Sequence, residues 1–367
     1  MGEEEGDFGD MQDIPETHPE NASIQNLFDK FNDVNTEPDD DMERIFDRDV
    51  DDDEVICEKE AKVDEDDSVE DGIPAQDSFS DSDNDEDEEA KESSKNGDLI
   101  GDSVEGEIIE QHWNFQAVGA VITGATHIRN GLPCQDSLFI SSANAKYAVA
   151  CVADGHGSKS SPYSDEGAKD ATRIASEIIV ASLDNLTAHK DIWLPKQIEA
   201  EWKKAIIERH EKAERDLANP FPYIQYGTTL IALAVLEGLA FALQIGDGNI
   251  LMVDKSGVVH PILATNEVGE DTESLCLDNA WKHMRTRIVP IDISDAPCMF
   301  LISTDGYDKS FVDDAGFLKV GTDYFNRWQE NGISSVGDEL EGLLRQTSGM
   351  GSGDDIALAL VVVEKKK

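Results

Sequence analysis

Four acidic turns, each next to an apolar run, carry the residues of this sequence that are best suited to chemistry. The first reads Ala153-Asp154-Gly155-His156-Gly157 and follows residues 147–152, a run typical of a buried strand. A carboxylate and an imidazole between two glycines pack poorly in a core, whereas glycine lets a ligand approach the main chain closely. Asp154 is therefore a candidate metal ligand, and His156 a candidate proton donor or acceptor. A turn with an incidental acid is the alternative.

The acidic pattern recurs three times further along the chain. Gly246-Asp247-Gly248, Thr304-Asp305-Gly306 and Gly353-Asp354-Asp355 each adjoin a run with the apolar composition of a strand. We expect the four turns to converge at one end of a sheet. Carboxylates that are brought together repel one another unless a cation lies among them, so the pattern predicts a divalent metal ion.

Charge divides the chain into two parts. Residues 1–110 hold 43 acidic and 7 basic residues, while the remaining 257 residues hold 36 acidic and 23 basic residues. A segment so charged and so poor in apolar clusters buries too little surface to offset its ordering entropy, so we expect 1–110 to be a disordered acidic extension. Residues 111–367 are long enough for one domain with a sizeable core.

The composition argues against several classes of partner and location. Binding to nucleic acid or to an anionic membrane requires a basic surface, and the net charge of the chain is -49. A basic partner, in contrast, would suit the acidic extension. No apolar run reaches the roughly 18 residues of a membrane span, and the acidic start does not resemble a signal peptide. The five cysteines show no paired or metal-type spacing, which indicates reduced thiols and a cytoplasmic protein.

Patterns along 111–367 predict helices packed on a largely antiparallel sheet. Closely spaced apolar runs from 226 to 259 are joined by short turns, which implies hairpins. Helical periodicity marks 164–186, 195–217, 313–330 and 333–346, and residues 264–287 are polar and irregular, as in a surface flap. Two consecutive long helices fit a helical layer better than alternating strands and helices. The sequence therefore predicts a β-sandwich flanked by helices.

The motifs resemble those of the metal-dependent protein serine/threonine phosphatases of the PPM type, also called type 2C, over about 116–363. Each motif is weak alone, but six of them occur in the family's order, and the pattern is most similar to a bacterial-type branch. They are Gln135-Asp136, the pentapeptide at 153–157, Tyr226-Gly227-Thr228-Thr229, Gly246-Asp247-Gly248-Asn249, Ser303-Thr304-Asp305-Gly306 and Gly351-Ser352-Gly353-Asp354-Asp355-Ile356. The resemblance implies an α+β fold, with a central antiparallel β-sandwich and helices on both outer faces.

The resemblance also implies two bound Mn²⁺ or Mg²⁺ ions and a role for each acidic residue. Asp154 matches the carboxylate that bridges the two ions, and Asp247 matches one associated with a third, weaker position. His156 matches the general acid for the leaving oxygen, in a reaction without a phosphoenzyme. Oxygen ligands suit both ions. The implied metal residues are Asp154, Gly155, Asp305, Asp354, Asp247 and Asp136.

Three departures from the family pattern concern the same site. Gln135 stands where an acid or asparagine is usual. Gly131 occupies the position of the usual phosphate-binding arginine, and Arg129 lies two residues further back, where it could bind phosphate or be a solvated loop residue. Asp355 replaces a frequent asparagine and adds a like charge beside Asp354.

Three functions remain open at this point. The first is hydrolysis of phosphoserine and phosphothreonine in proteins, with phosphorylated proteins as substrates and a cognate serine/threonine kinase as a partner. The second is a catalytically weak pseudophosphatase that acts as a binding module, and the third is hydrolysis of another phosphoester. The complete set of metal acids favours an enzyme, whereas a missing arginine clamp would favour the binding module.

Overall fold

The computed structural model describes residues 113–366, except 144–145, 216–221 and 264–272. The acidic extension predicted for 1–110 lies outside the described residues, as does the first part of the flap predicted for 264–287. The described cysteines are all free thiols, as their spacing predicted. None of the described helices combines the length and apolar character that crossing a bilayer requires.

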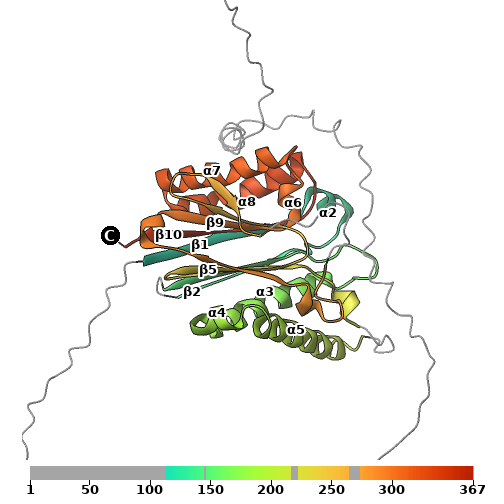
Figure 1. Ribbon diagram of the computed structural model, residues 1–367. Helices are drawn as coiled ribbons and strands as arrows, with labels where there is room; N and C mark the ends of the chain where they lie inside the picture. The colour runs from blue at the N-terminus through green and yellow to red at the C-terminus, as the bar shows by residue number, and fades with distance from the viewer. Residues whose placement is uncertain (1–112, 144–145, 216–221, 264–272, 367) are drawn as a thin grey trace, which may run out of the picture. The chain divides into compact units, whose positions relative to one another are not determined.

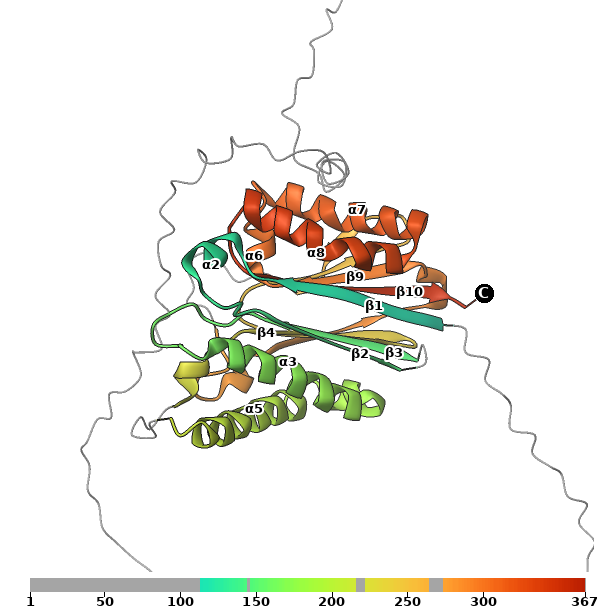
Figure 2. The same cartoon turned by 180° about the vertical axis from the view of Figure 1, so that it is seen from behind.

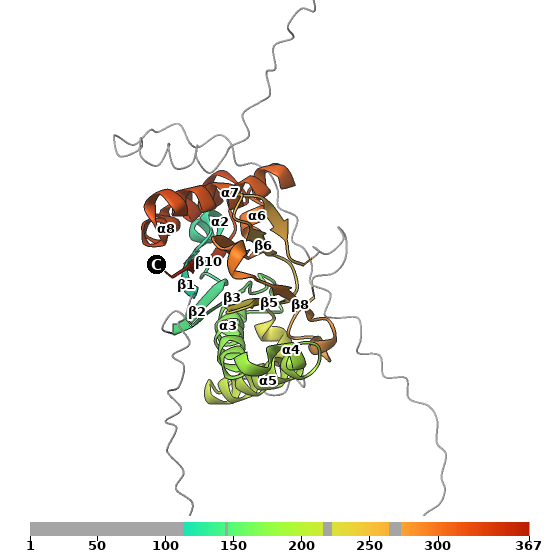
Figure 3. The same ribbon diagram turned by 60° about the vertical axis from the view of Figure 1, so that its left-hand side comes forward.

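Two five-stranded antiparallel sheets lie face to face at the centre of the fold (Figures 1 and 3). In spatial order, the first sheet contains β1 (Trp113–Ile122), β10 (Ile356–Lys365), β9 (Cys298–Ser303), β6 (Asn249–Val253) and β7 (Val259–Pro261). The second contains β2 (Ser137–Ala143), β3 (Tyr147–Ala153), β4 (Leu230–Leu236), β5 (Leu239–Ile245) and β8 (Arg285–Pro290). The predicted antiparallel β-sandwich is confirmed.

The central strands are apolar on both faces because each face contributes to a different core. In β3, Ala148 and Ala150 point into the space between the sheets, whereas Val149 and Cys151 pack against the helices outside. Successive side chains of a strand point to opposite faces, so the run at 147–152 must be apolar throughout.

Helices cover both outer faces of the sandwich, as expected (Figures 1 and 2). The second sheet is covered by α3 (Ser164–Ala181) and α5 (Trp193–Lys212), with the short α4 (Leu186–His189) between them. The first sheet is covered by α7 (Asp314–Asn331) and α8 (Ile333–Met350). The fold is therefore the α+β arrangement that the sequence predicted.

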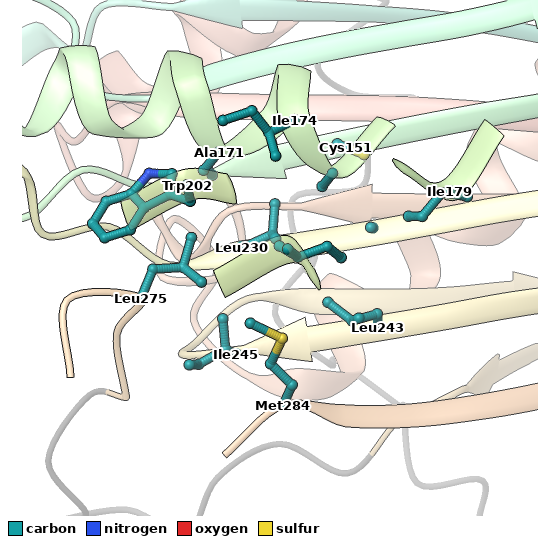
Figure 4. Close-up of a cluster of buried hydrophobic side chains, with 14 of the residues drawn as sticks. Cys151, Ala171, Ile174, Ile179, Trp202, Leu230, Leu243, Ile245, Leu275 and Met284 are labelled. Carbon is teal, nitrogen blue, oxygen red and sulfur yellow. The ribbon is translucent and has the colours of Figure 1, made fainter. Parts of the chain in front are cut away.

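The core under α3 and α5 shows how the helices are held on the second sheet. Trp202 is fully buried, and its indole Nε1 donates to the Gly167 carbonyl, 3.0 Å away, so α5 is joined to α3. Figure 4 shows Trp202 together with Ile174 of α3 and Leu230 of β4 in this cluster. Burial of large apolar side chains of this kind stabilises a fold by about 2 kcal/mol each.

The predicted boundaries differ from the structure in several places. The helix predicted for 195–217 ends at Lys212, and the one predicted for 333–346 extends to Met350. The helix predicted for 164–186 ends at Ala181, where a 3₁₀ turn (Leu183–Asn185) begins. Strand β8 begins at Arg285, inside the segment predicted to be irregular. The Asn130-Gly131 turn closes a short helix, α2 (Ala125–Asn130), that the pattern did not reveal, because none of its residues is buried. Gly131 ends that helix with a φ of 67°, which glycine adopts without strain.

Candidate active site

The acidic turns come together because the strands that precede or follow them end at the same edge of the sandwich. Asp136 directly precedes β2, and Asp154 directly follows β3, the antiparallel neighbour of β2. Asp305 opens the short helix α6 (Asp305–Asp308) after β9, and Asp354 lies just before β10, the neighbour of β9. Helices α2 and α6 both lie at this end of the sandwich (Figure 2).

Asp136, Asp154, Asp305 and Asp354 form what we call the carboxylate cluster. Burial raises the pKa of Asp136, Asp154 and Asp354, and the charges of neighbouring acids raise it further. The charges of Asp136, Asp305 and Asp354 all act on Asp154. Like charges in a buried site favour the protonated acids, so the cluster would be stabilised by a cation among the oxygens.

Asp136 is held in the cluster by one short hydrogen bond. The Thr304 hydroxyl donates to Asp136 Oδ2 over 2.6 Å and accepts from the Ala357 amide at 2.9 Å. Thr304 therefore joins the start of β2 to β10 and, by donating, opposes the rise in the pKa of Asp136. This role of Thr304 could not be predicted from the sequence, because Thr304 and Asp136 are far apart along the chain.

The Thr228-Thr229 pair fixes the main chain of Asp154. The Thr229 amide donates to the Asp154 carbonyl at 2.8 Å, and the Thr228 hydroxyl donates to the same carbonyl at 2.9 Å. The Asp154 amide in turn donates to the Thr229 hydroxyl at 2.9 Å. These bonds use only main-chain atoms of Asp154, so its carboxylate stays directed to the cluster.

Gly155 occupies a place where no side chain fits. Its amide donates to the Gln135 carbonyl at 3.2 Å. A Cβ at this position would lie 2.8 Å from the carbonyl oxygens of Gln135 and Ser164, closer than real Cβ atoms approach. The backbone can come this close to its neighbours only as glycine.

His156 is buried beside the cluster, with 7% of its surface exposed. Its amide donates to the Gly227 carbonyl at 3.1 Å, which fixes the backbone. Burial lowers the pKa of the imidazole to about 4, although the charge of Asp305 acts in the opposite direction. The ring is therefore neutral at pH 7, and its Nε2 makes no hydrogen bond to any described residue. A buried nitrogen without a protein partner is suited to a ligand.

Asp355 has a different role from its neighbour Asp354. Its Oδ1 accepts from the Gly124 amide at 2.7 Å, and its Oδ2 accepts from the Gln135 amide at 2.7 Å and from His127 Nδ1 at 2.9 Å. We call this group the α2 anchor, because it ties the start of α2 to β10. The bond to Asp355 raises the pKa of His127. These donors compensate the like charge that the sequence placed beside Asp354.

Arg129 and Asp247 lie on segments that adjoin the carboxylate cluster. Arg129 is exposed near the end of α2, where its guanidinium donates to the Thr126 hydroxyl at 3.1 Å. Asp247 lies in the turn between β5 and β6, next to β9, since Asn249 pairs with Ser303. It is not among the charges that contribute most to the raised pKa values of the cluster.

Lys309 and Asp308 lie at the cluster although the sequence did not single them out. Lys309 Nζ is 2.9 Å from Asp305 Oδ2. Burial lowers the pKa of Lys309, but the charges of Asp305, Asp154 and Asp354 outweigh that effect and raise it. Burial raises the pKa of Asp308 to about 6, and the charge of Asp305 raises it further. The sequence could have predicted this ion pair, because residues spaced four apart, such as Asp305 and Lys309, lie side by side on a helix.

The donor set fits a hard divalent cation. Among the described residues, no three Asp, Glu, His or Cys side chains are arranged to hold a metal ion by themselves. Coordination would therefore need main-chain carbonyls and water as well, and Mg²⁺ in particular keeps several water ligands in proteins. The crowded carboxylates supply the negative charge that a divalent cation would neutralise.

Comparison with known proteins identifies the family. The description "Protein phosphatase 2C" belongs to the family whose model matches residues 123–345, which is more than half of the chain. The chain therefore belongs to the protein phosphatase 2C family, and the predicted enzyme class, a protein serine/threonine phosphatase, is confirmed. No curated protein is similar enough in sequence to count as a relative.

Several solved structures are similar to this chain, with low sequence identity. The catalytic domain of the phosphatase PstP, in complex with two manganese ions, is 15% identical over 69% of this chain and 99% of that chain, with a TM-score of 0.43. PppA of Pseudomonas aeruginosa is 17% identical over 69% and 98%, with a TM-score of 0.47. RsbX, in complex with magnesium, is 16% identical over 68% and 96%, with a TM-score of 0.42.

Proposed function

We propose that residues 111–367 hydrolyse phosphoserine and phosphothreonine in proteins with the help of two Mn²⁺ or Mg²⁺ ions held at the carboxylate cluster. The observation that carries the proposal is the convergence of four acids whose burial and mutual repulsion raise the pKa of Asp136, Asp154 and Asp354. Such a cluster costs stability unless a cation neutralises it, so metal binding is the function it fits best.

Within this proposal the acids divide the work of metal binding. Asp154 would lie between the two ions, Asp305 and Asp354 would each contribute a carboxylate, and the Gly155 carbonyl would serve one ion. Asp136 stays near the metals through its bond to Thr304, and Asp247 belongs to a third, weaker position. When bound, the ions lower the pKa of water and clamp the phosphate oxygens for in-line attack, without a phosphoenzyme.

His156 would donate the proton to the leaving oxygen. Its buried ring is neutral at pH 7, and its Nε2 has no partner among the residues described. A substrate phosphate beside the ring adds negative charge, which favours the protonated imidazole. The proton then neutralises the serine or threonine alkoxide as it leaves.

We also assign partners and a location within this proposal. Phosphorylated proteins are the substrates, a cognate serine/threonine kinase acts on the same proteins, and the acidic extension at 1–110 binds a basic partner. The extension holds 43 acidic and only 7 basic residues, so its negative charge favours a positively charged partner. Free thiols suit a cytoplasmic location. The alternative is a pseudophosphatase that binds phosphoproteins without turnover.

The test measures phosphate release from a phosphothreonine peptide by the full chain, with Mn²⁺ and with a chelator. Asp154→Asn is the test variant, and Asp338→Asn, at an exposed position of α8, is the matched control. We expect metal-dependent turnover in the wild type and the control, and a loss of at least about 100-fold in Asp154→Asn. Mn²⁺ binding without turnover would point to the pseudophosphatase, and neither binding nor turnover would reject the proposal.

A further inference from the structure

A lysine takes part in the carboxylate cluster, where the family pattern led us to look for an arginine. Lys309 follows Asp305 by four residues, at the end of α6, and the two side chains form an ion pair of 2.9 Å. Its charge is also attracted by Asp154 and Asp354. The ammonium group is therefore paired with one acid of the cluster and attracted by two others.

The exposure of the two partners differs. The Lys309 side chain is 54% exposed, whereas that of Asp305 is only 14% exposed. The ammonium group thus lies on the solvent side of the buried carboxylates. A phosphate that enters from solvent toward the cluster would meet this positive charge first, and lysine is a common phosphate ligand in proteins.

Lys309 and a metal ion would compete for the same carboxylate. If a metal ion takes Asp305, the ammonium group loses its partner in the ion pair. The four-carbon stem of lysine is flexible, and its three N–H donors adapt to a new acceptor. A phosphate bound beside Asp154, Asp305 and Asp354 would lie within reach of the freed group.

We propose that Lys309 is the phosphate-binding residue of this enzyme: it pairs with Asp305 before the metal binds and contacts the substrate's phosphoryl oxygens afterwards. This assignment rests on the proposed function, because it requires a phosphate at the cluster. It gives Lys309 the part that the family pattern assigns to an arginine, and it makes Arg129 unnecessary for phosphate binding.

Arg129 provides the natural comparison. It is exposed on α2 and donates to Thr126 on its own helix. Lys309, on a different element of the fold, is paired with an acid of the cluster, Asp305. Both residues carry one positive charge, so a glutamine substitution at either position changes the net charge of the protein by the same amount. The two variants differ only in the position that loses its charge.

The experiment compares the full chain with Lys309→Gln, Lys309→Arg and Arg129→Gln. Titration calorimetry measures binding of Mn²⁺, and then of inorganic phosphate to the Mn²⁺-loaded protein. Steady-state kinetics with a phosphothreonine peptide gives kcat and KM. We expect Lys309→Gln to weaken phosphate binding about tenfold and to raise KM by a similar factor, because one charge-assisted contact is lost. Its Mn²⁺ affinity should equal or exceed that of the wild type, because the competitor for Asp305 is gone.

The two matched variants sharpen the result. Lys309→Arg should retain most of the phosphate affinity, and Arg129→Gln should bind phosphate within about twofold of the wild type. Unchanged phosphate binding in Lys309→Gln would overturn the assignment, as would a loss of phosphate binding in Arg129→Gln. Weaker Mn²⁺ binding in Lys309→Gln would also overturn it, because Lys309 would then support the metal site instead of competing with it.

Failure of the proposed function gives a different pattern. If the wild type binds Mn²⁺ and phosphate but does not turn over the peptide, the enzyme activity is rejected, while the calorimetry still decides the role of Lys309. If the Mn²⁺-loaded wild type binds no phosphate, both proposals are wrong.

Discussion

The carboxylate cluster and the α2 anchor contain adjacent aspartates in opposite surroundings. Asp354 lies in the cluster, where burial and the charge of Asp305 raise its pKa. The Asp355 carboxylate accepts three hydrogen bonds, from two backbone amides and from His127. Asp354 accepts one hydrogen bond, from the Asp355 amide at 2.8 Å, so it meets like charges with a single donor, whereas Asp355 has three donors.

The difference shows how to tell a structural acid from a reactive one. Donors that surround a carboxylate satisfy it, so it stabilises the fold and has no need of a ligand. Acids that surround a carboxylate leave it destabilised until a cation arrives. Residue type alone does not separate the two, because both positions are aspartates in one acidic turn.

The largest effect is expected from Asp354→Asn. The amide keeps the shape of the side chain but removes one charge from the cluster, so Mn²⁺ affinity should fall by about 100-fold. In the presence of chelator the variant should unfold at a slightly higher temperature than the wild type, because repulsion with Asp305 is relieved. Calorimetry and thermal unfolding measure the two effects. A variant that binds Mn²⁺ like the wild type would show that Asp354 is not a metal ligand.

A smaller effect, on stability, is expected from Asp355→Ala. The substitution leaves the amides of Gly124 and Gln135 without their acceptor, and the free energy of unfolding should fall by about 3 kcal/mol. Urea unfolding in chelator measures this loss without any contribution from metal. Asp338→Asn is the control for a change of surface charge. If Asp355→Ala were as stable as the wild type, the α2 anchor would not hold the fold.

The smallest effect is the pH dependence of the same anchor. The bond to Asp355 raises the pKa of His127 above its unfolded value of 6.5, so the protonated ring stabilises the folded state. That contribution is complete below pH 6.5 and disappears as the pH rises through the folded pKa. His127→Gln should therefore cost about 1 kcal/mol at pH 6 and less at pH 9, as measured by urea unfolding at both values. An equal cost at both pH values would contradict the ion pair.

Much of the fold could be predicted from the sequence because its signals are local. Apolar runs with hairpin turns defined the sandwich, and helical periodicity defined α3, α5, α7 and α8. The motifs around Asp154 and Asp305 led to the correct family. Helix α2 was missed because it buries no side chain, so no periodic pattern marks it.

The site could be predicted only in part, because several of its contacts join distant parts of the chain. The donors to Asp355 come from residues more than 200 positions away, and Thr304 is 168 positions from Asp136. No local pattern reveals such contacts. Lys309 was within reach of sequence reasoning, since its spacing from Asp305 is helical. The metal roles of Asp154, Gly155, Asp305, Asp354, Asp247 and Asp136, the catalytic role of His156 and the phosphate role of Arg129 all stay predictions.

The placement of Asp154 at the tip of β3 has a consequence for how the enzyme loses activity on heating. Strand β3 is covered by side chains on both faces and paired on both edges, by β2 and β4. Amide protons of such a strand exchange with solvent only when most of the domain opens. The proposed bridging carboxylate therefore belongs to the part of the fold that opens last, and thermal inactivation should coincide with global unfolding instead of preceding it.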